Sequence, residues 1–130
     1  MPTGGHVPSL YVLNIAALTK PHAVEQLAVD LGYSADVAVI TETHLKVKHV
    51  DGVMNIPDFT LFRRDRHRRR GGGVAVYVRS VLQPALWTYS ADNQLYELLW
   101  VRVGSTVIGA LPPADVRCVI GLHLSYALLN

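Results

Sequence analysis

A strand, a helix and a second strand follow one another near the start of the chain, and this succession constrains the fold most. Leu10 to Ile15 (LYVLNI) is a short apolar run that predicts a buried strand. A helix of about three turns is predicted from Pro21 to Gly32, because apolar residues repeat on one face between them. Val37 to Thr41 is a second apolar run. Continuously apolar strands around a helix are typical of parallel neighbours in an α/β sheet.

A polar residue stands at the carboxyl end of each of these strands. Asn14 lies at the end of the first, and Glu42 directly follows the second. Carboxyl ends of parallel strands meet at one edge of a sheet, where open α/β sheets bind ligands. A hard cation such as Mg²⁺ needs only one or two carboxylates when a substrate phosphate completes its ligands. We therefore predict catalytic roles for Asn14 and Glu42, with Glu42 as the metal ligand. The alternative is an ordinary solvated strand end.

An arginine-rich segment followed by three glycines is the other distinctive feature. Six of the twelve basic residues fall within eight positions, so the formal net charge of +2 understates the local positive field. Guanidinium groups match phosphate oxygens, and glycine lets a backbone approach closely. The predicted contacts to the phosphates of a polyanion such as a nucleic acid are Arg63, Arg64, Arg66, Arg68, Arg69 and Arg70. The alternative is a solvated hairpin tip.

Four further strands are predicted without intervening helices, at Phe59 to Phe62, Gly73 to Val78, Tyr96 to Val103 and Thr106 to Leu111. Gly104-Ser105 is a two-residue hairpin signal, and Tyr96 and Trp100 are expected to share a core face. Val116 to Leu129 fits a strand or a helix equally well. The predicted class is α/β (α+β), with a mixed, mainly antiparallel sheet and one clear packed helix.

Composition narrows the function classes. A chain of 130 residues, half of them hydrophobic, predicts one ordered domain. The single cysteine, Cys118, allows no internal disulfide and no zinc site built on cysteines. The six histidines lack metal-ligand spacing on one helix face, and most are expected at the surface, with an approach of His44 to the site as the less favoured alternative. The start, MPTGGHVPSL, lacks secretory features, and no apolar stretch reaches the roughly 20 residues of a membrane helix. We expect an intracellular protein without membrane partners.

With these residues in hand, the chain resembles the endonuclease/exonuclease/phosphatase superfamily, and more closely the apurinic-type endonuclease domain of non-LTR (LINE-like) retrotransposon polyproteins. The similarity lies in LNIAALTKPHAVEQL, DVAVITETHL, FTLFRRDR, RRGGGVAVYVRS, YELLWVRV and VIGAL, from about Leu10 to Pro113. It implies the first half of a four-layer αββα sandwich and hydrolysis of DNA phosphodiesters with Mg²⁺, or Mn²⁺ in its place. Glu42 matches the metal-binding glutamate, and Asn14 matches the asparagine that contacts the phosphate network.

Several landmarks of the resemblance are missing. Leu111 runs straight into Pro112 and Pro113 where Tyr-His is usual, and neither an Asp-x-Asn nor a Ser-Asp-His follows. General acid and base help, typically worth about 10²- to 10⁴-fold, is then lost, so we expect little or no catalysis. The resemblance divides the chain into a truncated domain over 1–113 and a departing apolar tail over 114–130. The inner sheet face would then be covered by that tail or by self-association, or the chain would aggregate.

The resemblance also implies DNA as partner, a nuclear place of action, and a reverse transcriptase domain on the carboxyl side in the ancestral polyprotein. Two rival hypotheses remain. One is a DNA-binding module that uses the arginine-rich segment without chemistry. The other is an open reading frame remnant without function.

Overall fold

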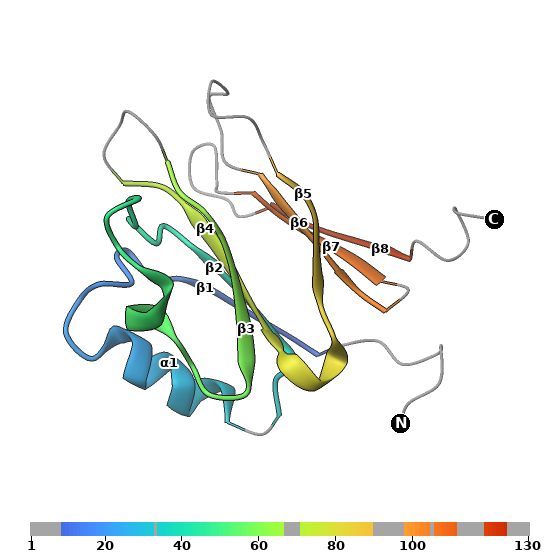
Figure 1. Cartoon of the computed structure of the whole chain (residues 1–130), viewed down its shortest axis with the longest axis horizontal. Coiled ribbons are helices and arrows are strands. Elements are labelled where there is room, and N and C mark those ends of the chain that lie inside the picture. The colour runs from blue at the N-terminus through green and yellow to red at the C-terminus, as the bar shows by residue number, and fades with distance from the viewer. Residues whose placement is uncertain are drawn as a thin grey trace.

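Two four-stranded sheets stack face to face, with one α-helix on the outer side of the first sheet (Figure 1). This computed structural model describes residues 9–32, 34–66, 71–89, 98–104, 106–111 and 119–124. The first sheet has the order β1-β2-β4-β3 and the second β5-β6-β7-β8. Their bounds are β1 Leu10–Asn14, β2 Val37–Thr41, β3 Phe59–Arg64, β4 Val74–Arg79, β5 Ala85–Tyr89, β6 Leu99–Val103, β7 Thr106–Leu111 and β8 Val119–Leu124.

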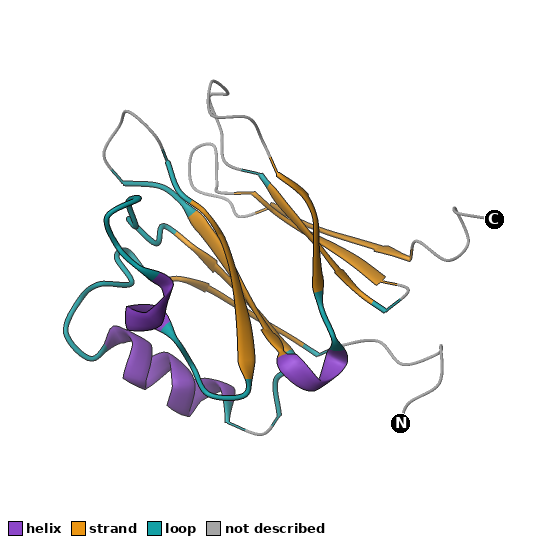
Figure 2. Ribbon diagram, viewed as in Figure 1, coloured by secondary structure: helices purple, strands orange, loops and turns teal. Residues whose placement is uncertain are grey.

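The first sheet is mixed, as predicted. β1 and β2 run parallel, joined by α1 (Ala23–Leu31), while β4 runs antiparallel to both β2 and β3. The second sheet is antiparallel throughout. The α/β (α+β) prediction is confirmed, with two short 3-10 helices, η1 (Asp51–Met54) and η2 (Ser80–Leu82), besides α1. Figure 2 shows α1 and η1 beside the first sheet, and η2 where the chain passes from β4 to β5.

Alternate residues of β2 and β4 supply two separate cores, because successive side chains of a strand point to opposite faces. Ala38, Ile40 and Tyr77 face the helix and pack with Leu27 and Leu31 of α1. The opposite faces pack against the second sheet, in a cluster that contains Val37, Val39, Val74, Val76, Val78, Leu99, Val101 and Ile108. Both strands are almost wholly buried, which explains their continuous apolar sequence.

The chain thus supplies a second sheet for its own first sheet, which corrects the expectation of an uncovered inner face. The main contacts between the sheets are those of β3 with β6 and of β4 with β6 and β7. β1 lies at the edge of this packing, and Leu10 and Val12 are 37% and 45% exposed. The expectation of an open apolar face therefore holds only for β1.

Two further differences from the sequence-based prediction concern the second sheet. β5 was not predicted, and the irregularity between Leu86 and Thr88 breaks the alternation that would have marked it. Trp100 is half-buried on the outer face, edge-on to Trp87 with ring centroids 6.0 Å apart, while Leu99 and Val101 enter the core. Tyr96 lies outside the described residues.

The ambiguous segment after residue 115 contains a strand. β8 pairs antiparallel with β7, so part of the tail assigned to 114–130 extends the second sheet. The division of the chain at residue 113 remains a prediction. Among the described helices, none has the length and apolar character needed to cross a bilayer.

Candidate active site at the carboxyl ends of β1 and β2

The parallel register brings Asn14 and Glu42 to the same edge of the first sheet. Asn14 lies opposite Thr41, and Glu42 is the next residue. The chain beyond β1 continues alongside, with the backbone N–H of Ala17 donating to the Glu42 carbonyl at 2.8 Å. The Asn14 side chain is exposed and that of Glu42 is 30% exposed, so both are open to a ligand. The predicted proximity is confirmed, and the roles stay predictions.

His44, whose approach to the site was the less favoured alternative from the sequence, belongs to the same edge. His44 Nε2 lies 3.9 Å from Glu42 Oε1. Glu42 and His44 both have φ of 56°, in the left-handed region that non-glycine residues seldom occupy, while Thr43 between them is fully buried. Such strain persists only where the surroundings enforce it, and it concentrates at functional sites. The sequence signal for the placement of His44 beside Glu42 was the spacing Glu-x-His at a strand end.

The three glycines hold this turn from the other side. The Thr43 N–H donates to the Gly73 carbonyl at 3.3 Å, and the His44 N–H donates to the Gly72 carbonyl at 2.8 Å. A Cβ on Gly73 would lie 2.5 Å from Thr43 Oγ1, so only glycine fits there without displacement. The close backbone approach predicted for these glycines is thus made to the turn that carries Glu42.

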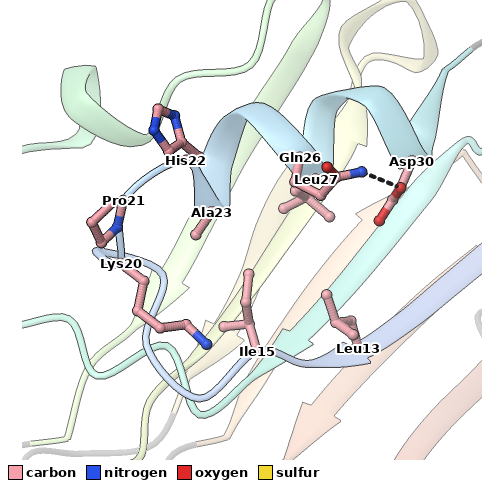
Figure 3. A pocket seen from close by; sticks show the side chains of 9 residues that line it. All are labelled: Leu13, Ile15, Lys20, Pro21, His22, Ala23, Gln26, Leu27 and Asp30. Carbon is pink, nitrogen blue, oxygen red and sulfur yellow. Dashed lines mark hydrogen bonds between the residues drawn. The ribbon is translucent and has the colours of Figure 1, made fainter.

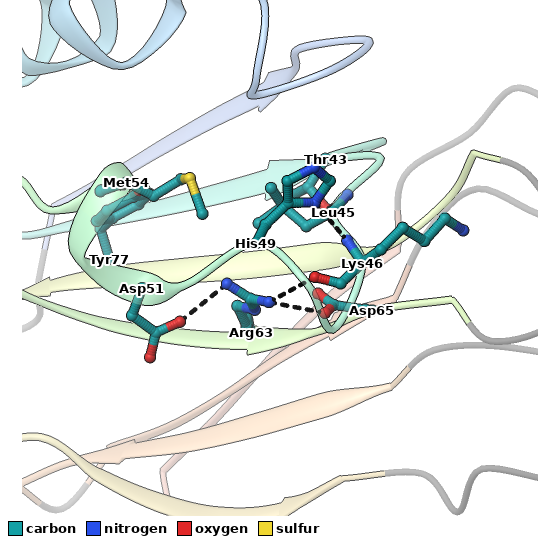
Figure 4. Close-up of polar contacts among 9 residues, drawn as sticks. All are labelled: Thr43, Leu45, Lys46, His49, Asp51, Met54, Arg63, Asp65 and Tyr77. Atoms are coloured by element: carbon teal, nitrogen blue, oxygen red, sulfur yellow. Dashed lines mark hydrogen bonds and ion pairs between the residues drawn. The ribbon is translucent and has the colours of Figure 1, made fainter.

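The described arginines are engaged within the protein. Arg63 is only 13% exposed and donates to Asp51 Oδ1 at 2.9 Å, Asp65 Oδ2 at 3.1 Å and the Lys46 carbonyl at 2.9 Å (Figure 4). It therefore ties the loop before η1 to the end of β3.

Arg66 is partly buried, and its guanidinium packs against Gly72, where a Cβ would overlap it. Arg64 is also partly buried. Arg68, Arg69 and Arg70 lie outside the described residues. Contact of all six arginines with DNA stays a prediction.

The donor set at this edge fits a divalent cation that is held only in part by protein. Glu42 offers a carboxylate, His44 an imidazole and Asn14 an amide oxygen. In the described part of the chain, no three His, Cys, Asp or Glu side chains gather as a metal cage. Such an incomplete set suits cations that keep water and substrate phosphate among their ligands.

A groove of about 510 Å³ lies elsewhere, between α1 and the edge strand β1 (Figure 3). Leu13, Ile15 and Leu27 line it together with Lys20 and Asp30, and Gln26 donates to Asp30 at 3.0 Å. This lining is mainly apolar. The polar groups suited to phosphate chemistry lie at the strand ends instead.

Comparison with known proteins supports the fold alone. No family model matches the chain, and no curated protein matches it significantly. Among solved structures, the chain is similar to the 3′ phosphatase NExo from Neisseria bound to product DNA hairpin, with a TM-score of 0.59 and 16% identity. The match covers 79% of this chain and 40% of that chain. The shared fold is consistent with the endonuclease/exonuclease/phosphatase-like sandwich that the sequence resemblance implies.

Proposed function

We propose that the chain binds a DNA phosphate at the Asn14–Glu42 edge together with a divalent cation, and that its chemistry is hydrolysis of DNA phosphate esters. The observation that carries this proposal is the parallel register, which sets Asn14 beside the residues leading into Glu42. The likeness to a DNA-bound phosphatase supports the choice of DNA over other phosphate esters.

In this proposal each residue has a distinct task. The Glu42 carboxylate holds the cation, and the Asn14 amide donates to a phosphate oxygen and orients it. A bound cation supplies Lewis-acid polarisation of the phosphoryl oxygen and a more acidic water. The turn Glu42 to His44, fixed by hydrogen bonds on both sides, keeps the carboxylate in place before substrate arrives.

The rate is expected to be low for this chain alone. The sequence lacks the tyrosine, Asp-x-Asn and Ser-Asp-His elements that the resemblance associates with proton transfer and water positioning. We further propose an origin in a non-LTR retrotransposon endonuclease with Mg²⁺, or Mn²⁺ in its place, as the cation, on the strength of the motif order from Leu10 to Pro113.

Plasmid nicking by the purified chain tests the proposal, with a second substrate arm of hairpin DNA ending in a 3′ phosphate. Wild type is compared with Glu42→Gln and with a metal-free reaction. Glu25→Gln is the matched control, since Glu25 is an exposed carboxylate on α1. Nicking or phosphate release that disappears with Glu42→Gln and without metal, but survives Glu25→Gln, supports the function. Equal activity in Glu42→Gln contradicts it.

A second function, DNA binding without chemistry, is favoured by the arginine-rich segment. It predicts an affinity that falls steeply with salt and is indifferent to Mg²⁺ and to Glu42→Gln. Fluorescence anisotropy with a short duplex at several salt concentrations measures this. A folded chain that binds in this way and neither nicks nor releases phosphate has the second function.

A further inference from the structure

We propose that His44 is a second protein ligand of the divalent cation, alongside Glu42, and that the site therefore prefers Mn²⁺ to Mg²⁺. This inference rests on the proposed function, in which Glu42 holds a divalent cation. The two side chains come from one turn, and both are partly exposed at the same edge of the first sheet.

The separation of the two ligand atoms is at the long end for an ion pair and too long for a direct hydrogen bond, which leaves room for a shared ion. A charge-assisted hydrogen bond between imidazolium and carboxylate is about 2.7–2.9 Å long, and beyond roughly 3.5 Å no hydrogen bond exists. His44 Nε2 and Glu42 Oε1 are 3.9 Å apart. The exposed pair His22 and Glu25 shows the contrast, because its atoms lie 3.3 Å apart in direct contact.

The same separation fits two ligands of one cation. Bonds of about 2.0–2.2 Å from nitrogen and oxygen to a metal allow two ligand atoms to lie up to roughly 4.4 Å apart, and about 3.0 Å apart at a right angle. The observed distance falls inside this range. Rotation of the side chains that moves the ligand atoms by less than about 1 Å shortens this distance to the value expected for two ligands at a right angle.

The backbone of the turn is fixed on both sides, so only the side chains of Glu42 and His44 have to adjust on binding. Leu18 N–H donates to the Thr43 carbonyl at 2.8 Å from one side, and His44 N–H donates to the Gly72 carbonyl at 2.8 Å from the other. Gly71 lies against the His44 ring, 3.5 Å from Nε2 to an ideal Cβ position. Preorganisation of this kind strengthens a site that has few protein ligands.

The chemistry of the pair decides which cation it prefers. Mg²⁺ takes oxygen ligands almost exclusively, whereas imidazole suits transition metals and carboxylate accepts both. An imidazole beside the carboxylate therefore lowers the preference for Mg²⁺, and Mn²⁺ is the first-row ion that shares carboxylate and water as ligands with Mg²⁺, so the remaining positions stay open to water and phosphate. Loss of the imidazole is expected to abolish this preference and to leave the binding of Mg²⁺ by Glu42 nearly unchanged.

Mn²⁺ titration of the full chain, followed by electron paramagnetic resonance, tests the inference without any activity assay. The variants are His44→Asn and Glu42→Gln, since asparagine tolerates the left-handed backbone at position 44. His22→Asn is the matched control, because His22 also has positive φ and a glutamate neighbour. Spin-echo modulation from ¹⁴N reports an imidazole bound to Mn²⁺ directly, and competition with Mg²⁺ gives the preference.

We expect ¹⁴N modulation in wild type and His22→Asn and none in His44→Asn, with Mn²⁺ affinity at least about tenfold weaker in His44→Asn. Mn²⁺ binding that needs Glu42 but is unaffected by His44→Asn overturns this inference and leaves the proposed function standing. Mn²⁺ binding that is equal in Glu42→Gln, or absent from folded wild type, overturns both.

Discussion

Asn14 of β1 is the register partner of Thr41 of β2, and Glu42 is the residue that follows Thr41. The pairing is parallel, and parallel strands end at the same edge. Two residues 28 positions apart in the sequence therefore share one surface as a consequence of a single βαβ crossover. The first two predictions concern this edge and the glycines that hold it.

Asn14→Ala is expected to lower metal-dependent hydrolysis by about 10- to 100-fold, because one oriented donor to phosphate is lost. The free energy of unfolding should change by less than about 0.5 kcal/mol, since the side chain is exposed. Phosphate release and urea unfolding measure the two effects. Asn55→Ala is the control, an exposed asparagine beyond η1. Equal activity of the two variants would remove Asn14 from the site.

Gly73→Ala separates backbone strain from steric conflict when it is compared with Gly104→Ala. Both glycines have positive φ, 90° and 61°, but an added Cβ meets Thr43 Oγ1 at Gly73 and nothing within 4 Å at Gly104. Gly104→Ala should cost about 1–2 kcal/mol of unfolding free energy from strain alone. Gly73→Ala should cost about 1–3 kcal/mol more, because Thr43 must shift. Urea unfolding measures both, and equal losses would show that the glycines do not brace the turn.

The βαβ unit could be predicted because its signals are local. β2 and the Asn14–Glu42 edge follow from apolar runs, a helix period and the parallel connection rule. The helix begins at Ala23 and not at Pro21, because His22, with φ of 66°, takes the position before it. Such ends depend on one backbone angle that sequence patterns do not encode.

The sequence-based prediction was wrong where a tertiary contact determines which face of a strand is buried. A period of two predicts that Trp100 and Leu99 point to opposite faces, but it does not say which face is inside. The face of β6 that carries Leu99 and Val101 packs into the core between the sheets, and Trp100 lies on the outer face against Gly109. The approach of His44 to the site stayed the less favoured alternative for a similar reason, since it depends on the unusual backbone of two residues.

Arg63→Ala is expected to destabilise the protein by about 3–5 kcal/mol, because it leaves the buried Asp65 carboxylate without its ion-pair partner. Asp51→Ala should cost less than about 1 kcal/mol, since Asp51 is 69% exposed and solvent screens its pair with Arg63. Urea unfolding of the two variants distinguishes these costs.

Arg63→Lys tests the DNA contact separately, because lysine keeps the charge. The internal ion pairs predict lower stability with DNA affinity unchanged. Weaker DNA binding at unchanged stability would instead restore Arg63 to the DNA-binding surface that the sequence predicts.

Tyr77 gives the last prediction, which concerns alkaline stability. It is fully buried and donates from Oη to the Met54 carbonyl at 2.8 Å. Burial first, and then the negative charge of Asp51, raise its pKa above the ordinary value of 10.0, while Arg63 acts in the opposite direction. An acid whose pKa is raised by folding stabilises the folded state below the unfolded pKa and loses that contribution as pH rises. Wild-type stability should therefore fall increasingly above about pH 10.

Tyr77→Phe removes this titration together with the hydrogen bond. At about pH 8 the variant should be less stable by about 0.5–1.5 kcal/mol, because the Met54 carbonyl loses its donor. Above about pH 10 the gap should close, since only wild type must keep a tyrosine protonated against the solvent. Urea unfolding of both proteins at the two pH values measures the gap, and the other tyrosines cancel because both proteins carry them. A gap that stays constant until both proteins unfold would mean that the Tyr77 hydroxyl titrates as it does in solvent.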